Sequence, residues 1–378
     1  MQVIHFVRGR PKPESPNGVL TAVYSLFHAQ LKENFHSVKI VGMLNSYKAA
    51  STDSDGLCTY LPCSRWPFKL SSKMISYIST INSNKTVAHL HMVNVPQLYV
   101  LARCLRKYNI KYVISPHGGF SENSLKRSRI KKLIFNIFFQ KYINKHAEKL
   151  IALTPREKLE FERFGIPPSK IEVIPNGLLF EEPILKWKHI SSDEELSVIF
   201  IGRLDYWHKG LDLLFSAFAL LPERYSGRRV FLDIIGPDWL GGAKIAENLV
   251  KRLGIEKRVR FHGAVYGEEK LKILKAANVF VLASRNEGMP VSVLEAFKQG
   301  VPVVISKETN ISEEAARLGA CVFVDLNSEA VAKGIDFLLS SSDRRERMAF
   351  CAYQYAKDTF SSDQIAFKYS KLFKKILT

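Results

Sequence analysis

The sequence predicts an α/β protein built from two doubly wound parallel sheets in tandem. Apolar, β-branched runs alternate with segments of helical period along the chain, the pattern of strands buried on both faces of a parallel sheet. The chain has 378 residues, a length typical of two domains. Apolar residues make up 46% and charged residues 24%, which indicates a water-soluble fold and excludes wholesale disorder or a membrane bundle.

The front half is expected to supply the first sheet. Its first run, at 3–7, is too short for a secretion signal or a membrane span and is interpreted as a buried strand. Segment 20–31 has the helical period expected of a helix that covers such a sheet. The other predicted strands of this half lie at 37–44, 87–93, 111–118, 149–154 and 170–177.

The back half repeats this pattern after a segment without periodicity, 181–196, which is interpreted as the hinge between domains. From about Ser341 the pattern becomes helical. Near the end of the chain one helical stripe collects four apolar residues, Ile365, Tyr369, Leu372 and Ile376. The predicted strands of this half lie at 197–204, 230–236, 258–263, 279–284, 302–306 and 321–325.

Charge and cysteine content narrow the partners and the compartment. The net charge is +19, of which residues 1–180 carry +16 and residues 181–378 carry +3. That asymmetry indicates an acidic partner for the front half: an anionic membrane surface, a phosphate-bearing substrate or nucleic acid. Scattered cysteines without a CxxC pair indicate reduced, buried thiols in a cytoplasm; they are Cys58, Cys63, Cys104, Cys321 and Cys351.

Loops at the carboxyl ends of parallel strands are where ligands bind, and three of them stand out in the front half. Asn17-Gly18 closes the first loop before a helix, where glycine lets backbone N–H groups approach an anion; an ordinary turn is the alternative. His117, followed by two glycines, is either a ligand contact or a structural histidine. Asn176-Gly177 is better explained as a turn that ends a strand.

The second predicted sheet begins with a strand that ends in Gly202-Arg203, and Lys209-Gly210 follows at the start of a helix. Forked donors, a point charge and free backbone N–H groups at a helix start converge well on a diphosphate. The strand end and the glycines favour such a site over a merely solvated surface.

Segment 279–304 carries the strongest signal. Glu287 falls in a loop after a strand, and Glu295 lies about 7.5 Å along the helix that begins near Pro290. One carboxylate is therefore expected from the loop and the other from the helix. The intervening backbone N–H groups lie at the positive end of that helix; they belong to Gly288, Met289, Val291 and Ser292. A ligand with both hydroxyls and a phosphate fits this arrangement, as a nucleotide-linked sugar does.

Together, Gly202-Arg203, Lys209-Gly210 and the Glu287-x7-Glu295 spacing resemble the retaining glycosyltransferases of family 4. The resemblance runs from the first strand to the last helix. It implies the GT-B fold, in which two Rossmann-like domains face each other across a cleft and a C-terminal helix crosses back to the N-terminal domain. The domains are then expected at 1–180, with the helix of about 361–378, for the acceptor and at 181–360 for the nucleotide sugar.

The resemblance also implies residue roles. Catalysis would fall to Glu287, which binds the sugar hydroxyls at C3 or C4, to His117 near C6 and the reacting carbon, and to Arg203 and Lys209, which hold the donor diphosphate. The loop of Asn17 and Gly18 would meet the same phosphates, although many relatives have a tandem glycine there and the basic loop is an alternative acceptor site. The segment from Gly288 through Met289, Pro290 and Val291 would bind the donor, Glu295 the ribose, and the strand end from His262 to Val265 the base.

The implied mechanism is transfer with retention at the anomeric carbon, with the leaving diphosphate helping to take the acceptor proton on the same face. Neither a cofactor nor a metal is expected, because Arg203 and Lys209 neutralise the phosphates. Asp53-Ser54-Asp55 is interpreted as a solvated loop, since no apolar strand leads into it.

Segment 124–149 mixes basic residues with an apolar stripe, and a basic amphipathic helix of this kind either lies in a membrane interface or packs on its own domain. With the basic front half it favours a peripheral protein at the inner face of the plasma membrane and a lipid-linked saccharide acceptor. Bacterial surface polysaccharide, lipopolysaccharide or O-antigen synthesis is the expected setting. The apolar stripe comprises Leu133, Ile134, Ile137, Phe138 and Tyr142.

Other classes fit less well. Nucleic acid is not expected, because the basic residues are not interleaved with stacking aromatics on a recognisable module. A dehydrogenase would need GxGxxG after a strand, which the sequence lacks. A nucleotide-sugar-binding scaffold without transfer activity and a nucleotide-sugar epimerase remain as alternatives. A monomer or weak dimer is expected.

Overall fold

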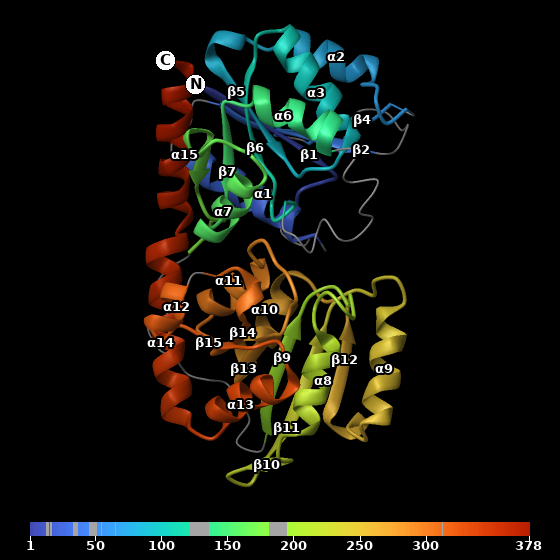
Figure 1. The fold of residues 1–378 in the computed structure, drawn as a ribbon, viewed down its shortest axis with the longest axis vertical. Coiled ribbons are helices and arrows are strands. Elements are labelled where there is room, and N and C mark those ends of the chain that lie inside the picture. The colour runs from blue at the N-terminus through green and yellow to red at the C-terminus, as the bar shows by residue number, and fades with distance from the viewer. Residues whose placement is uncertain are drawn as a thin grey trace. The chain divides into compact units, whose positions relative to one another are not determined.

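The chain divides into two compact units in the computed structural model. Unit 1 comprises Met1–Leu179 and Ser362–Thr378, and unit 2 comprises Phe180–Ser361. Each unit has a sheet covered by helices, so the prediction of two parallel-sheet α/β domains is confirmed (Figure 1). The structure describes all residues except 13–14, 16, 33–36, 45–50, 54, 65, 121–135, 181–194 and 312, and the side chains of 136–137.

Unit 1 contains an eight-stranded sheet in the order β3-β4-β2-β1-β5-β6-β7-β8. Every pair is parallel except β3 with β4, which is antiparallel. The strands are β1 (Gln2–Arg8), β2 (Ser37–Leu44), β3 (Ser51–Thr52), β4 (Cys58–Pro62), β5 (Thr86–His91), β6 (Lys111–Ser115), β7 (Lys149–Ala152) and β8 (Ile171–Val173).

Side chains of unit 1 alternate between two apolar layers, as strands buried on both faces must. Along β1, Val3 and Val7 join one layer while Ile4 and Phe6 join the other. Helices α1 and α15 pack together over the first layer, and the stripe predicted near the C-terminus is buried there. The helices are α1 (Gly18–Lys32), α2 (Ser72–Ser79), α3 (Pro96–Lys107), α6 (Lys141–His146, after the π-helix Asn136–Gln140), α7 (Pro155–Arg163) and α15 (Ser362–Leu377).

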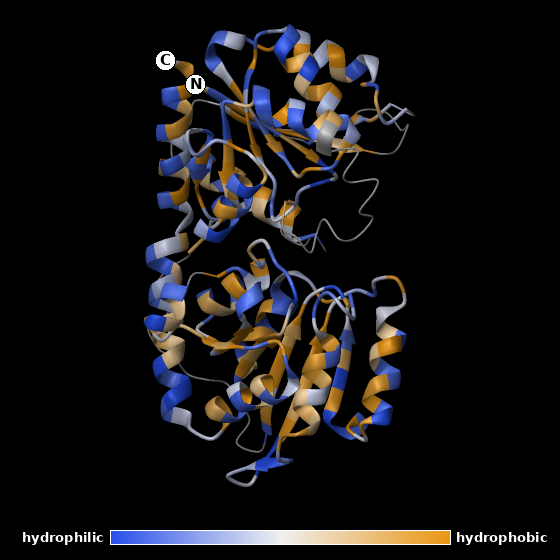
Figure 2. Ribbon diagram, in the orientation of Figure 1, coloured by the Kyte–Doolittle hydropathy of each residue, from blue (hydrophilic) through white to orange (hydrophobic). Residues whose placement is uncertain are grey.

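Unit 2 contains a seven-stranded sheet in the order β10-β11-β9-β13-β14-β15, with β12 pairing β11, and only β10 is antiparallel. Most of its strands are apolar, whereas β10 and part of β12 are hydrophilic and the helices show mixed surfaces (Figure 2). The strands are β9 (Glu195–Ile201), β10 (Arg224–Tyr225), β11 (Arg228–Ile235), β12 (Val259–Gly263), β13 (Val279–Leu282), β14 (Val303–Ser306) and β15 (Val322–Val324). The helices are α8 (Leu211–Ala219), α9 (Gly242–Arg252), α10 (Gly267–Ala276), α11 (Val291–Lys298), α12 (Glu313–Arg317), α13 (Ser328–Leu339) and α14 (Ser342–Phe360).

The structure bears on three segments that the sequence analysis interpreted: the hinge, the amphipathic segment and the loop of Asp53. The expected hinge ends earlier than predicted, because Glu195 and Leu196 already pair with β11; residues 181–194 lie outside the described residues. The amphipathic segment is described only from 136 onward, where its helix ends at His146 before β7. Asp53 lies in a turn between β3 and β4, with its N–H donating to Cys58 O at 2.9 Å. Among the helices described, none has the length and apolarity needed to cross a membrane.

Candidate functional site

The turn from β9 into α8 brings Lys209 to the end of β13. Gly210 caps α8 in the left-handed region at φ +64°, and a Cβ built there would stand 1.9 Å from Ala283 O. Only glycine therefore fits this close approach of two backbones. The Lys209 N–H donates to Asp205 O at 2.9 Å, which closes the turn in which Lys209 lies. Gly210 thus allows the turn before α8 to pack against the end of β13, and this places Lys209 there.

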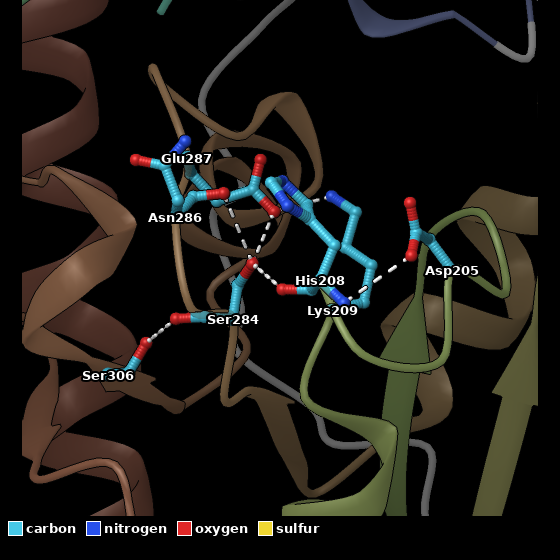
Figure 3. Close-up of polar contacts among 7 residues, drawn as sticks. All are labelled: Asp205, His208, Lys209, Ser284, Asn286, Glu287 and Ser306. Carbon is cyan, nitrogen blue, oxygen red and sulfur yellow. Dashed lines mark hydrogen bonds and ion pairs between the residues drawn. The ribbon is translucent and has the colours of Figure 1, made fainter. Parts of the chain in front are cut away.

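Lys209 and Glu287 form the centre of the site in unit 2, as Figure 3 shows. The Lys209 Nζ donates to Glu287 Oε1 at 2.5 Å, and each side chain is only 12% exposed. Ser284 Oγ donates to the same carboxylate oxygen at 2.8 Å. Ser306 Oγ in turn donates to Ser284 O at 2.5 Å. The strand ends of β13 and β14 therefore position the carboxylate, as expected for a ligand site at the carboxyl ends of parallel strands.

The charges around Glu287 favour its ionised form. Burial by itself raises the pKa of this carboxyl, but the Lys209 charge and hydrogen bond, with smaller contributions from His208 and Ser284, bring the pKa below its ordinary value. Burial lowers the pKa of His208, which lies next to this pair. The site therefore offers an ammonium for an anion and a carboxylate that accepts hydrogen bonds from hydroxyls.

Glu295 has a lysine partner of its own. It lies inside α11, and Lys270 of α10 donates to its Oε1 at 2.6 Å. The side chains of this pair are 16% and 15% exposed. Helix α11 begins at Val291 with Pro290 as its N-cap, so the free N–H groups of its first turn lie between the two carboxylates in sequence. Gly288 and Met289 form the loop that leads into this turn.

Arg203 follows β9, where Gly202 N–H donates to Ile235 O of β11 at 2.9 Å. Its guanidinium lies over the ring of Trp239, 4.3 Å from the ring centre. Gly236 makes this crossing of the two strand ends possible, since a Cβ there would stand 1.8 Å from Gly202 O. Stacking on an indole keeps the five N–H donors of an arginine available while it restricts the side chain.

The residues expected to line a base lie at the end of β12. His262 is engaged with Asp233 of β11, with 2.8 Å between Nε2 and Oδ1, while Ser197 Oγ donates to Asp233 Oδ2 at 2.6 Å. Val265 lies in the loop between β12 and α10. The imidazole of His262 is thus held by its neighbouring strand, and 30% of the side chain is exposed.

His117 lies in unit 1, in the loop after β6. Its backbone is left-handed at φ +54°, and Gly118 follows at φ +78°. Gly118 N–H donates to Glu157 Oε1 at 2.6 Å, and Leu153 N–H donates to Oε2 of the same carboxylate at 2.6 Å. Burial raises the pKa of Glu157 to about 7. A buried carboxyl at the start of α7 therefore fastens the strained loop that carries His117.

Asn17 and Gly18 begin α1. Asn17 Oδ1 accepts a hydrogen bond from Val19 N–H at 3.0 Å, so the side chain caps the helix that Gly18 starts. Asn176 and Gly177 line a small pocket with His91 and His117 inside unit 1.

Several contacts of the site escape sequence reasoning. Lys270 and Ser284 carry no motif, and their partners follow from tertiary packing. Glu157 does carry a signal: Thr154 Oγ accepts from Glu157 N–H at 3.1 Å, which is the Thr-x-x-Glu pattern of a helix start. The two histidines of β5, His89 and His91, are a second signal, since alternate residues face the same side of a strand.

Comparison with known proteins identifies related sequences over most of the chain. The model for "Glycosyl transferases group 1" matches residues 181–355, and that for "Glycosyltransferase Family 4" matches residues 16–179. An uncharacterized glycosyltransferase of Methanocaldococcus jannaschii is 32% identical over 54% of this chain and 53% of its own length. A UDP-Gal:alpha-D-GlcNAc-diphosphoundecaprenol alpha-1,3-galactosyltransferase of Escherichia coli is 27% identical over 62% of this chain and 61% of its own.

Solved structures resemble the fold along nearly its whole length. Sucrose-phosphate synthase from Thermosynechococcus elongatus superposes with a TM-score of 0.79 at 18% identity, over 99% of this chain and 98% of that one. Anabaena HepE in complex with UDP and glucose superposes with a TM-score of 0.73 at 17% identity, over 99% of this chain and 100% of that one. At these identities the likeness shows the fold alone, and it is the GT-B fold.

Proposed function

Because the chain belongs to the group 1 and family 4 glycosyltransferases, we propose that it transfers a hexose or N-acetylhexosamine from a nucleotide-diphosphate sugar. The observation that carries the proposal is the pair of largely buried carboxylates, Glu287 and Glu295, each held by a lysine. Carboxylates accept hydrogen bonds from sugar and ribose hydroxyls, and the lysines and the α11 N-terminus attract the diphosphate between them. UDP bound to Anabaena HepE supports a nucleotide as the ligand.

The proposed transfer retains the configuration of the anomeric carbon. The bond from that carbon to the diphosphate oxygen breaks, and a bond to an acceptor hydroxyl oxygen forms on the same face. The hydroxyl proton passes to the departing diphosphate, so no separate nucleophile is required. In this proposal Arg203, which stacks on Trp239, and Lys209, which pairs with Glu287, stabilise the charge on the leaving group. Because they supply this positive charge, the reaction is proposed to need no metal and no cofactor.

We propose a lipid-linked saccharide as the acceptor and an anionic membrane as the surface on which unit 1 works. The Escherichia coli relative, named for a diphosphoundecaprenol acceptor, supports this choice. We propose bacterial surface polysaccharide synthesis as the setting. Residues 1–180 carry a charge of +16. Exposed aromatic side chains in the described part of unit 1 include Trp66 at 72%, Phe68 at 46%, Phe138 at 66% and Phe367 at 64%. Aromatic rings beside basic residues suit a membrane interface.

Product analysis tests the transfer. Purified protein is given a nucleotide sugar with a lipid-diphosphate saccharide acceptor, and we expect a glycosylated lipid, released nucleoside diphosphate and the donor's anomeric configuration in the product. Turnover should persist in EDTA. An inverted product would contradict the mechanism. Conversion of the donor without acceptor would identify an epimerase, and binding without turnover would identify a scaffold.

Flotation tests the membrane surface. We expect the protein to float with anionic but not neutral liposomes, and the variant W66S/F138S to float less. Phe350 of unit 2 is also exposed, at 52%, so F350S is the matched control that should bind like the wild type. Equal flotation with both lipids would contradict the proposal.

Light scattering tests the oligomeric state. We expect a monomer or weak dimer, and a stable oligomer would contradict that expectation.

A further inference from the structure

Unit 1 contains a buried row of histidines that leads to His117. β1 and β5 lie side by side with His5 opposite His89, and His91 lies two residues further along β5 on the same face. All three side chains are fully buried, at 0 to 1% exposure. Strand alternation places them under α1 and α15, where the ring of His89 stands 5.3 Å from that of Tyr369.

Direct contacts join the row into one chain. His5 Nε2 lies 2.7 Å from Gln30 Oε1 of α1, and His5 Nδ1 lies 3.0 Å from His91 Nε2. His91 Nδ1 lies 3.1 Å from His117 Nε2. Both ring nitrogens of His5 and of His91 are therefore engaged, and the order along the chain is Gln30, His5, His91, His117.

These rings are neutral near pH 7. Burial lowers the pKa of His5 and of His117 to about 4, and burial together with neighbouring histidines lowers the pKa of His91 well below its ordinary value. A neutral imidazole has one N–H and one lone pair. When one ring donates to the next, the second ring must donate from its other nitrogen, so the tautomers of all three rings are coupled.

Gln30 sets the direction of the chain. Its Oε1 can only accept, so His5 carries its proton on Nε2 and accepts at Nδ1. His91 must then donate from Nε2 to His5, and His117 must donate from Nε2 to His91. The lone pair of His117 remains on Nδ1. Since His91 and His117 line the small pocket that Asn176 and Gly177 also border, the end of the chain reaches this pocket.

A metal site is the competing explanation, because one nitrogen each of His5, His89 and His91 lie within 4.8 Å of one another. The contacts favour the hydrogen-bonded chain. The 3.0 Å between His5 Nδ1 and His91 Nε2 is a hydrogen-bond distance, and both nitrogens of His5 and of His91 already have partners in the chain. His89 forms a side branch, with 2.7 Å from its Nε2 to Ser115 Oγ.

We propose that Gln30, His5 and His91 are positioning residues that hold His117 in the Nε2–H tautomer, so that His117 Nδ1 accepts a hydrogen bond from a ligand hydroxyl. The proposal rests on the proposed function for the identity of that ligand, a sugar. The coupling of the four side chains stands on the contacts within unit 1. It assigns Gln30, His5 and His91 an indirect role in sugar recognition, through His117.

The tautomer is measured directly by long-range 1H–15N NMR of ring-labelled histidine, with signals assigned from His91→Gln and His117→Gln. In the ligand-free wild type we expect His5, His91 and His117 to be protonated on Nε2 alone. Protonation of His117 on Nδ1 would overturn the proposal. Spectra should be the same before and after EDTA, and a change would overturn it by showing that the nitrogens hold a metal.

Two variants of nearly equal size test the direction. Gln30→Met removes the acceptor, and we expect His117 to become a mixture of tautomers and donor kcat/KM to fall about tenfold, the effect of about one hydrogen bond. Gln30→Glu retains an acceptor and should keep the Nε2–H form. Ser115→Ala removes a partner from the His89 branch and should leave the His117 signals in place. An unchanged His117 spectrum in Gln30→Met would contradict the inference.

The two readouts separate this inference from the proposed function. The spectra are recorded without substrate, so a coupled set of tautomers in a protein without transfer activity refutes the function alone. Sugar transfer by a protein whose His117 is protonated on Nδ1 refutes the inference alone.

Discussion

Lys209 Nζ lies 2.5 Å from Glu287 Oε1, each side chain is only 12% exposed, and each loses its partner if the other is truncated. We expect K209A and E287A each to lower kcat by about 10² to 10³, the effect of removing a group that stabilises charge in the transition state. The far-UV spectrum should not change.

Steady-state kinetics with the donor measures this. Lys307 forms an exposed pair with Asp325, with side chains 60% and 67% exposed, so K307A is the matched control for loss of a lysine. It is expected to keep wild-type rates. Near wild-type turnover in K209A or E287A would refute the assignment of these residues.

Glu157 gives a pH-dependent prediction. Its pKa is raised to about 7 in the fold, so between about pH 4.5 and 7 the folded state binds a proton that the unfolded state has lost. This group therefore makes the wild type less stable as pH rises through that window. In E157Q the slope is absent, so the stability advantage of the wild type should shrink from pH 5 to pH 7.5. Urea unfolding at both values measures the difference, and a constant or growing advantage would contradict it.

Some residues of the site can be predicted from local sequence spacing, and others depend on tertiary packing. Lys209, Glu287 and Glu295 follow from local spacing, because a strand end and a helix start fix their place. Lys270 depends on how α10 packs beside α11, and no local pattern encodes that contact. Contacts between segments distant in sequence are therefore what the sequence alone leaves open.

At the scale of an element, Gly210 joins the start of α8 to β13. A Cβ there meets Ala283 O at 1.9 Å, whereas Gly227, at φ +83°, has nothing within 4 Å of its added Cβ. Both G210A and G227A incur the cost of a left-handed alanine, about 1 to 2 kcal/mol. Only G210A must also displace backbone, so it should lose clearly more stability in urea unfolding and should bind donor more weakly. Equal losses in the two variants would contradict this account of the turn.

Strands that are buried on both faces were predictable, because their runs are continuously apolar, as in β9 and β13. The short strand β4 was not predicted: CTYLP mixes polar residues with a proline, and it pairs near the edge of its sheet. Edge strands need less apolar surface, so they leave a weaker pattern in the sequence.

At the scale of the whole chain, α15 returns to unit 1 after unit 2 is complete. Phe373 on this helix is fully buried in the layer under α1, whereas Phe367 is 64% exposed. We expect F373A to cost about 3 to 5 kcal/mol and F367A less than about 0.5 kcal/mol. Chemical unfolding followed by circular dichroism measures both. Similar small losses would show that α15 contributes little to unit 1.

The stripe of α15 could be predicted from its period, and its burial confirms that it is a packing face. The sequence does not predict which layer α15 covers. Several sheet faces offer apolar surface, and the choice depends on the complementary shape of α1. The same holds for the histidine chain, whose members come from β1, β5 and the loop after β6. Only the parallel register brings them together.

The central claim is that unit 2 binds a nucleotide-diphosphate sugar without a metal, and thermal unfolding against UDP-, GDP-, ADP- and dTDP-sugars, with and without EDTA, tests it most directly. A ligand at 100 times its dissociation constant stabilises a protein by about 2.7 kcal/mol. The account predicts a rise in Tm with one nucleotide, unchanged by EDTA and lost in K209A. No rise with any donor, or a rise that EDTA abolishes, would contradict it.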